Sequence, residues 1–323
     1  MNSIWITGAD GFVGTWMRRA LDRAGHDWAA LVLPSSLDQF ENHPAIGIDL
    51  ADLAAREVDD DGIDWSILPP PSGLIHLAAM SFAPECEQMP DMARAVNVVG
   101  PSRMYQSILK QWPDCPILHI SSGQVYRPSP DPIPEEQPLE PVNVYGSTKL
   151  EAESVALGLR DRGHRVSVLR PFNHTGPGQA SIYALPSFAL RLAALEAAGG
   201  GVLQVGRLDA VRDFLHVREV VNCYLQLLES AGEVDILNVC SGHGLEMSIL
   251  LASLQQHFST SITLVQDENR LRGAADANHL VGDPRRLEKI LGHKPELDLA
   301  ELSRELVADA RLRVADGEDL SRA

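Results

Sequence analysis

The sequence predicts an α/β protein with a doubly wound parallel sheet and a smaller C-terminal α/β lobe. Three observations lead to this fold class. Short apolar runs alternate with helical patterns through the first half of the 323-residue chain, as is typical of βαβ units around a parallel sheet covered on both faces. A glycine-rich turn follows the first apolar run directly. After about residue 173 the alternation gives way to helices separated by isolated strands.

The first half contains the elements that build the expected sheet. Each strand is a short apolar run, and most are separated by a longer segment with helical periodicity. The expected strands cover residues 3–7, 28–33, 45–49, 73–77, 116–121 and 165–170. The expected helices cover residues 13–24, 91–111 and 145–162. We therefore expect residues 1–172 to form a dinucleotide-binding domain.

The second half predicts the smaller lobe. Its expected helices cover residues 184–198 and 217–229, and its expected strands cover residues 202–205, 211–215 and 235–239. We expect residues 173–323 to form mainly the substrate lobe, with some strands and helices returning to the first domain.

Charge and cysteine usage exclude several classes of protein. The 27 Lys and Arg against 44 Asp and Glu give a net charge of −17, which opposes binding to nucleic acid or to an anionic membrane. An anionic substrate would therefore need local arginines. The four cysteines show no Cys-x-x-Cys pairing, so we expect buried thiols and no metal site. The chain shows no cationic leader and no membrane-length apolar run, which favours a cytoplasmic protein.

The glycine-rich turn at residues 7–14 places three glycines at three-residue spacing between an expected strand and an expected helix. Glycines at this point allow a tight turn, a close approach of backbone N–H groups to a pyrophosphate, and packing of the helix on the sheet. The turn therefore predicts a Rossmann-type dinucleotide site. Its candidate residues are Gly8, Gly11, Phe12, Val13 and Gly14.

The ribose end of this site leaves the cofactor choice open. An Asp or Glu about 20 residues after the turn normally holds the ribose of NAD, but residues 31–36 contain neither an acid nor an arginine. Ser35, or its neighbour Ser36, is suited to bond either a ribose hydroxyl or a 2′-phosphate. NAD(P)H is therefore the predicted cofactor, with NADH against NADPH unresolved. Further candidates at strand ends are Asp49, Leu50, Leu77, Ala78 and Ala79.

A candidate proton-transfer group lies at the start of the helix at 145–162. Tyr145 and Lys149 lie one helical turn apart on the same face, so the ammonium and an oxidised nicotinamide both favour the phenolate. Upstream, Ser122 follows an expected strand and supplies a hydroxyl for the substrate oxygen that Tyr145 protonates. The glycine turn, Ser122, Tyr145 and Lys149 occur in the chain order of a dehydrogenase site.

These residues resemble the extended short-chain dehydrogenase/reductase family, which includes nucleotide-sugar epimerases, dehydratases and reductases. The resemblance covers nearly the whole chain. It implies that Ser122, Tyr145 and Lys149 are the catalytic triad. It also implies cofactor contacts from residues 76–79, Asp49, Asn97 and Pro171, and a homodimer formed through the helices at 91–111 and 145–162.

Two later segments, residues 170–179 and 211–214, are similar to the reductases that convert GDP-4-keto-6-deoxy-D-mannose to GDP-D-rhamnose. This resemblance implies that Asn173, Arg212 and Arg272 hold the diphosphate of a nucleotide sugar, in keeping with bidentate Arg–phosphate contacts. Ser122 and Gln124 are the expected contacts to the sugar. The partner is then a nucleotide sugar, most simply a GDP-linked one.

The reaction follows from what lies beside the catalytic hydroxyl. Dehydratases of the family carry an acid one or two residues after it, whereas this chain has Gly123 and Gln124, which do no acid/base work. Dehydration is therefore disfavoured. The triad alone suits both a 4-ketoreductase and a 4-epimerase with tightly bound NAD, and the subgroup resemblance favours reduction. A regulator that binds the dinucleotide without turnover is disfavoured because the triad is intact.

Overall fold

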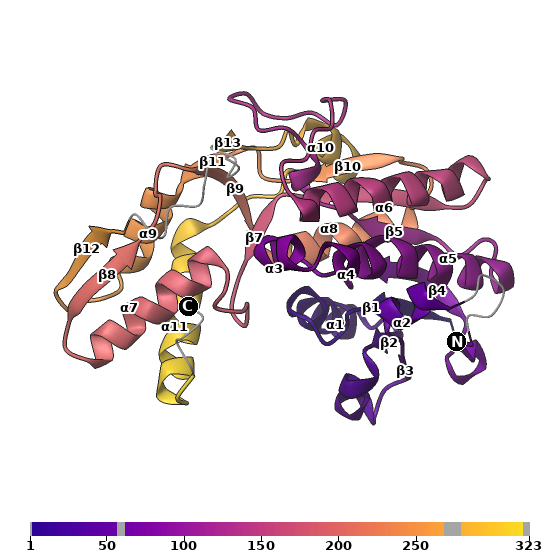
Figure 1. The fold of residues 1–323 in the computed structure, drawn as a ribbon, viewed down its shortest axis with the longest axis horizontal. Coiled ribbons are helices and arrows are strands. Elements are labelled where there is room, and N and C mark those ends of the chain that lie inside the picture. The colour runs from indigo at the N-terminus through magenta and orange to yellow at the C-terminus, as the bar shows by residue number, and fades with distance from the viewer. Residues whose placement is uncertain (1, 57–61, 268–278, 319–323) are drawn as a thin grey trace.

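The computed structural model describes residues 2–56, 62–267 and 279–318. Two lobes lie side by side, a larger one that contains the N-terminus and a smaller one built from the second half of the chain (Figure 1).

The larger lobe is built on a seven-stranded sheet with the order β10-β6-β5-β4-β1-β2-β3, in which every pairing is parallel. The strands are β1 (Ser3–Thr7), β2 (Trp28–Val32), β3 (Ala45–Gly47), β4 (Pro71–His76), β5 (Ile117–Ile120), β6 (Val166–Pro171) and β10 (Ile236–Val239). Because β1 lies between β2 and β4, the winding reverses there, and a ligand crevice forms outside the carboxyl ends of these strands. The predicted doubly wound sheet is confirmed.

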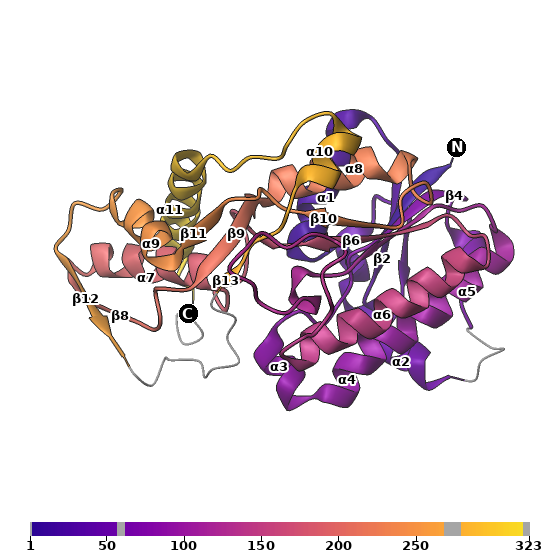
Figure 2. The same ribbon diagram turned by 90° about the horizontal axis from the view of Figure 1, so that it is seen from above.

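Helices cover both faces of this sheet (Figure 2). One face carries α1 (Phe12–Ala24), α8 (Val217–Glu229) and α10 (Arg285–Leu291). The other carries α2 (Leu50–Ala55), α5 (Gly100–Gln111) and α6 (Val144–Asp161). Shorter elements are α3 (Ala83–Gln88), α4 (Pro90–Arg94), η1 (Pro34–Phe40), η2 (Trp65–Ile67) and η4 (Gly123–Val125).

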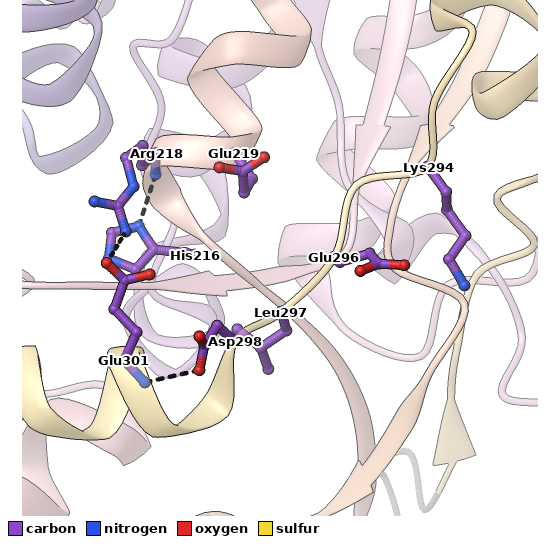
Figure 3. Close-up of a pocket in the computed structure, with 8 residues that line it drawn as sticks. All are labelled: His216, Arg218, Glu219, Lys294, Glu296, Leu297, Asp298 and Glu301. Carbon is purple, nitrogen blue, oxygen red and sulfur yellow. Dashed lines mark hydrogen bonds and ion pairs between the residues drawn. The ribbon is translucent and has the colours of Figure 1, made fainter.

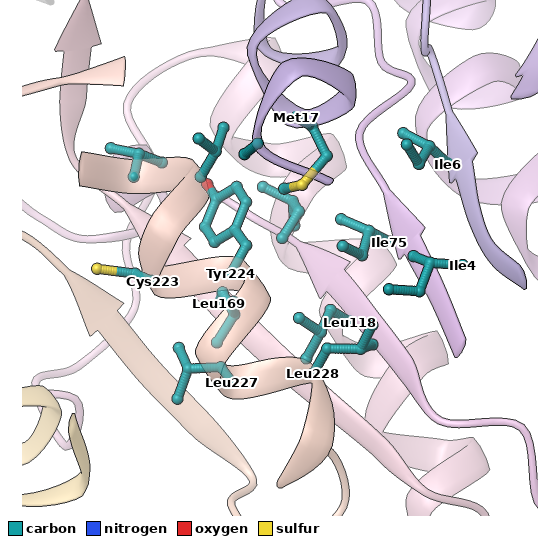
Figure 4. Packing of buried hydrophobic residues seen from close by; sticks show 14 of the residues in the cluster. Ile4, Ile6, Met17, Ile75, Leu118, Leu169, Cys223, Tyr224, Leu227 and Leu228 are labelled. Atoms are coloured by element: carbon teal, nitrogen blue, oxygen red, sulfur yellow. The ribbon is translucent and has the colours of Figure 1, made fainter. Parts of the chain in front are cut away.

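Helix α8 shows how the second half of the chain completes the first sheet. Its buried residues Val220, Tyr224, Leu227 and Leu228 recur at helical spacing and pack on β4 and β5 in the core of Figure 4. A Cβ added to Gly73 would lie 2.9 Å from Leu228, so the glycine admits the helix close to the sheet. Each buried leucine contributes about 1.5–3 kcal/mol.

The predicted helix at 91–111 is interrupted. A π-helical segment, η3 (Ala95–Val99), separates α4 from α5. The sequence pattern gave no sign of this segment. One extra residue per turn changes the direction of the side chains around it, and such bulges often occur at functional sites. Here the buried Asn97 bonds the loop that follows β4.

Among the described residues, the smaller lobe contains two short sheets and three helices. In the first sheet β9 (Val211–His216) pairs with β7 (Asn173–Thr175), β11 (Gly244–Glu246) and β13 (His279–Leu280). In the second, β8 (Gly201–Val205) pairs with β12 (Ile262–Gln266). The helices α7 (Ala184–Ala197), α9 (Met247–Gln255) and α11 (Leu299–Ala315) pack against one another around a core of their own.

The chain passes between the two lobes repeatedly within the described residues. The passages lie at 171–173, 216–217, 239–244, 280–285 and 291–299. At one of these passages His216 is the last residue of β9. Its side chain caps α8 by accepting the N–H of Arg218 at 2.9 Å.

The structure also bears on the expectations about the cysteines and about membrane-spanning segments. The four cysteines, Cys86, Cys115, Cys223 and Cys240, are all free and buried, which confirms the predicted buried thiols. No helix in the part of the chain that the structure describes has the length and apolar character needed to cross a membrane.

Candidate active site

The glycine turn connects β1 to α1 at the crevice, and each glycine has a structural reason. Gly8 has a φ of +63°, and a Cβ there would lie 3.0 Å from the backbone of Ala78. A Cβ on Gly14 would lie 2.1 Å from the carbonyl oxygen of Gly8, so no side chain fits. Gly11 caps α1 with extended backbone.

The first N–H groups of α1, from Phe12, Val13 and Gly14, have no carbonyl partner within the helix and point out of its N-terminal end. This end attracts an anion through both N–H donors and the helix dipole. The turn thus fits a pyrophosphate group: backbone donors are aimed at one place, and the glycines keep side chains out of the turn.

The loop after β4 forms the opposite wall of the crevice. The N–H of Ala78 donates to the Thr7 hydroxyl at 3.0 Å. Asn97 bonds both backbone groups of Met80, accepting its N–H at 2.8 Å and donating to its carbonyl at 3.0 Å. A third Asn97 hydrogen bond, donated to the Thr148 hydroxyl at 3.0 Å, joins this loop to α6. Leu77, Ala78 and Ala79 are therefore held in place beside the glycine turn, with Asn97 as a positioning residue.

The remaining predicted cofactor contacts lie near strand ends. Asp49 follows β3 and caps α2, accepting the N–H of Ala51 at 2.8 Å. Leu50 is buried, and its carbonyl oxygen lies 2.3 Å from where a Cβ of Gly100 would be. Capping and packing account for these two residues, and contact with a cofactor stays a prediction for both. Ser35 is exposed in η1, directly after β2, and Pro171 ends β6.

The three predicted catalytic residues converge on one point. Ser122 follows β5, and its hydroxyl accepts the N–H of Gln124 at 3.1 Å. The Ser122 hydroxyl lies close enough to the Tyr145 phenol to act on its pKa. Lys149 lies one turn further along α6, with Nζ 6.0 Å from the centre of the Tyr145 ring. It donates to the carbonyl oxygen of Ile120 at 2.7 Å.

The start of α6 is fixed by residues around Ser122. Asn143 caps the helix by accepting the N–H of Gly146 at 2.7 Å and donates to the Gln124 side chain at 2.8 Å. A Cβ on Gly146 would lie 2.4 Å from the backbone oxygen of Gln124, so the glycine permits this close approach. Gln124, a predicted substrate contact, is thereby tied to the helix that carries Tyr145.

Burial sets the protonation states of this group. Burial raises the pKa of Tyr145, while the Ser122 hydroxyl acts in the opposite direction. Burial lowers the pKa of Lys149 to about 8, with the Glu153 carboxylate opposing the shift. In the free protein the expected pull of Lys149 on Tyr145 is therefore outweighed by burial. The phenol stays protonated at neutral pH, which is the form that a proton donor needs.

A buried ion pair behind the triad was missed by the sequence analysis. Arg170 and Glu153 are each about 1% exposed and form two hydrogen bonds, at 2.9 and 2.6 Å. Glu153 also accepts the hydroxyl of Ser121 at 2.5 Å, and Arg170 donates to the hydroxyl of Tyr126 at 2.6 Å. The available signal was Glu153 itself, an acid one turn after Lys149 on the buried face of α6.

The second unpredicted feature is a bridge between the lobes. Ser81, in the loop after β4, hydrogen-bonds to the hydroxyl of Tyr183 at 2.9 Å, and the neighbouring Phe82 meets the Tyr183 ring edge-on. Tyr183 belongs to the smaller lobe and lies close enough to Tyr145 to raise the pKa of its phenol. The bridge therefore crosses the cleft next to the catalytic group. We found no sequence signal for it, because the two residues are far apart in the chain.

The predicted phosphate-binding residues lie on paired strands of the smaller lobe. Asn173 begins β7 and is paired with Phe214 of β9, two residues beyond Arg212. Both predicted residues are half-buried. Asp213, between Arg212 and Phe214 on β9, points into the protein, where it accepts the N–H groups of Ser241 and Gly242 at 2.9 Å. Arg272 lies outside the described residues.

Two cavities lie away from the triad. One, of about 360 Å³, separates the starts of α8 and α11 and is lined by His216, Arg218, Glu219, Lys294, Glu296, Leu297, Asp298 and Glu301 (Figure 3). Internal ion pairs already satisfy much of its charge, such as Arg218 with Glu301 at 3.2 Å. The other, of about 670 Å³, lies beside β8 and is lined by Val205, Gly206, Arg207, Leu208, Asp209, Glu246, Ser248 and Gln266.

Comparison with known proteins agrees with this geometry. A family model described as GDP-mannose 4,6 dehydratase matches residues 5–306. The GDP-6-deoxy-D-mannose reductase of Pseudomonas aeruginosa is 33% identical over 319 residues, which cover 97% of this chain and 98% of the reductase.

Solved structures of similar proteins also match nearly the whole chain. RMD from Pseudomonas aeruginosa, complexed with NADPH, matches with a TM-score of 0.82 and 33% identity over 97% of this chain and 100% of its own. A putative epimerase from Burkholderia cenocepacia matches with a TM-score of 0.80 and 29% identity over 96% and 98% of the two chains. The chain therefore belongs to the GDP-mannose 4,6 dehydratase family, within the extended short-chain dehydrogenases/reductases.

Proposed function

We propose that this protein is an NAD(P)H-dependent reductase of the 4-keto group of a nucleotide sugar, converting GDP-4-keto-6-deoxy-D-mannose to GDP-D-rhamnose. The observation that carries the proposal is the convergence of Ser122, Tyr145 and Lys149 beside a glycine turn, with Gly123 and Gln124 where a dehydratase needs an acid. The similarity to a GDP-6-deoxy-D-mannose reductase supports the choice of substrate.

The chemistry divides among the three side chains. A bound reduced nicotinamide supplies the hydride for the keto carbon. Tyr145 donates its phenolic proton to the keto oxygen, for which the raised pKa keeps the proton in place beforehand. Ser122 holds the same oxygen through its hydroxyl, and the Lys149 ammonium stabilises the phenolate left behind. With a pKa of about 8, Lys149 carries most of this charge at neutral pH.

The smaller lobe holds the substrate in this proposal. Arg212 and Asn173 bind the diphosphate, and Arg212 provides local positive charge on a chain of net charge −17. The cavity beside β8 is lined by residues 205–209, which precede β9, the strand of Arg212, in the chain. Its volume of about 670 Å³ suits the nucleoside end of the same ligand.

The proposal is tested by the ratio of reduced cofactor oxidised to product formed. Supplied with GDP-4-keto-6-deoxy-D-mannose, the purified protein should oxidise one reduced cofactor per GDP-rhamnose formed, followed by nicotinamide absorbance and product chromatography. Interconversion of hexoses with no net use of cofactor would replace the reductase by a 4-epimerase with tightly bound NAD, the activity suggested by the match to a putative epimerase. A dehydrated product, or dinucleotide binding without turnover, would also refute the proposal.

We further propose that the protein forms a homodimer and acts in the cytoplasm. Met89 before α4, Met92 within α4 and Val142 before α6 expose 43%, 46% and 41% of their surface, near the ends of the helices that the family resemblance assigns to the dimer. Four unpaired thiols suit a reducing compartment. Sedimentation at micromolar concentration should give twice the monomer mass of 35.2 kDa, and cell fractionation tests the location.

A further inference from the structure

A carboxylate lies inside the glycine turn and is held toward the end of β2. Asp10 stands between Gly8 and Gly11, and its Oδ2 accepts the hydroxyl proton of Ser36 at 2.6 Å. Ser36 belongs to η1, which follows β2 directly. The bond therefore joins the place where a pyrophosphate would lie to the carboxyl end of the second strand. Asp10 is half-buried, so one side of its carboxylate faces solvent.

This position matters because of what lies there in doubly wound folds. The adenosine ribose of a dinucleotide lies at the carboxyl end of the second strand, where an acid usually accepts its hydroxyl protons. In this chain residues 33–36 contain no acid. Asp10 brings a carboxylate to the same place from the turn instead. A carboxylate accepts hydrogen bonds from a 2′-hydroxyl but repels the 2′-phosphate that distinguishes NADPH from NADH.

Arg18 is the cation that works against this repulsion. Its guanidinium lies over the Phe40 ring at 4.9 Å and donates to the hydroxyl of Thr15 at 3.2 Å. Burial lowers the pKa of Arg18, and the nearby Asp10 and Asp22 carboxylates oppose this shift. These contacts hold Arg18 against the side of α1. Its buried Nε has no partner among the described residues, so Arg18 is the group that would have to turn toward a 2′-phosphate.

We propose that Asp10, held by Ser36, makes this protein select NADH over NADPH. The inference rests on the proposed function and adds to it the choice of dinucleotide. It also separates this chain from the structurally similar RMD of Pseudomonas aeruginosa, which was solved with NADPH. Repulsion between a carboxylate and a phosphate at close range gives a preference of roughly 100-fold in binding.

Calorimetric titration of the full-length protein with NADH and with NADPH tests this without turnover. The wild type should bind NADH roughly 100-fold more tightly. Asp10→Asn keeps the shape of the side chain, removes its charge, and should reduce the preference to less than about 10-fold by tightening NADPH. Ser36→Ala should partly reduce the preference for NADH, because the Asp10 carboxylate loses the hydrogen bond from Ser36. Raising the ionic strength should shrink the wild-type preference through screening.

Asp27→Asn is the matched control. This exposed acid directly precedes β2, at the opposite end of the strand, so the variant loses the same charge and should keep the wild-type preference. Thermal melts identify any variant that fails to fold, and Ser36→Ala then supplies the answer in place of Asp10→Asn.

Equal binding of both dinucleotides to the wild type, or an unchanged preference in Asp10→Asn, overturns the inference and leaves the reductase proposal standing. Tight NADPH binding that Arg18→Gln abolishes overturns it as well and makes Arg18 the phosphate ligand. If neither dinucleotide binds, the proposed function and the inference are both wrong.

Discussion

The catalytic region of the larger lobe and the proposed phosphate site of the smaller lobe are built differently. Ser122, Tyr145 and Lys149 are each at most 8% exposed, and hydrogen bonds to the backbone hold Ser122 and Lys149 in place. Arg212 and Asn173 are half-buried and lie on strands of six and three residues. In the proposed mechanism the catalytic side chains are thus held in place before the substrate arrives, whereas recognition depends on side chains that still have solvent contact. Changes in the first region should alter turnover, and changes in the second should alter affinity.

The sharpest test of this division is Tyr145→Phe. Losing a positioned proton donor should lower turnover by about 10² to 10⁴, while dinucleotide affinity measured by calorimetry stays within a few-fold of the wild type. A circular dichroism melt should show little change, because the ring still fills its site. Near wild-type turnover in the purified variant would remove Tyr145 from the mechanism.

The buried ion pair gives the next largest effect, now on stability. Glu153→Gln leaves Arg170 buried without its counter-charge, which should cost about 3–5 kcal/mol of unfolding free energy in a urea titration. The matched control is Glu140→Gln, whose partner Arg127 is 68% exposed on its side chain, and it should cost less than about 1 kcal/mol. Equal losses in the two variants would show that burial does not set the strength of these pairs.

In the smaller lobe, Arg212→Ala should weaken nucleotide-sugar binding by about 2–3 kcal/mol, as for the loss of a charge-assisted phosphate contact. Dinucleotide affinity should barely change. Arg304→Ala, which removes an exposed arginine from α11, controls for the loss of net charge. If both ligands bind more weakly to Arg212→Ala, the arginine supports the fold and does not bind the substrate.

Removing the hydrogen bond between Ser81 and Tyr183, which joins the two lobes, should have the smallest effect of the four changes. Tyr183→Phe removes only the hydroxyl that Ser81 bonds, and a neutral hydrogen bond contributes about 0.5–1.5 kcal/mol. We expect KM for the sugar to rise roughly 3- to 10-fold with kcat nearly unchanged. Ser81→Ala should give a similar effect, and the double variant should be no worse than either. Fully additive effects would mean that the two side chains act separately.

The difference between the two regions also explains what the sequence could predict. The glycine turn, the strands of the large sheet and the triad have local signals, because each depends on residues a few positions apart. The strands β7, β11 and β13 have two or three residues, and they exist only because β9 pairs with them. Such pairing cannot be recognised in a short window of sequence. No helix or strand was predicted after residue 239.

Long-range contacts were missed for the same reason. The contact of Ser81 with Tyr183 joins residues 102 positions apart, and Glu153 with Arg170 depends on how α6 lies across β5 and β6. The π-helical segment at Ala95–Val99 was missed because its cause is tertiary: Asn97 bonds Met80 of another loop. The triad could be predicted because its chain order and spacing are local, whereas the contacts that hold these residues in place are not.

The repeated passage of the chain between the lobes has a consequence for motion. A protein whose halves are joined by a single strand can open like a hinge about that strand. Here several connections span the same junction, at 171–173, 216–217, 239–244, 280–285 and 291–299, and a wide opening would have to bend all of them together. We therefore expect the two lobes to move as nearly one body on the millisecond timescale. We expect entry of a nucleotide sugar to depend on side-chain and loop adjustment instead of on a wide separation of the lobes.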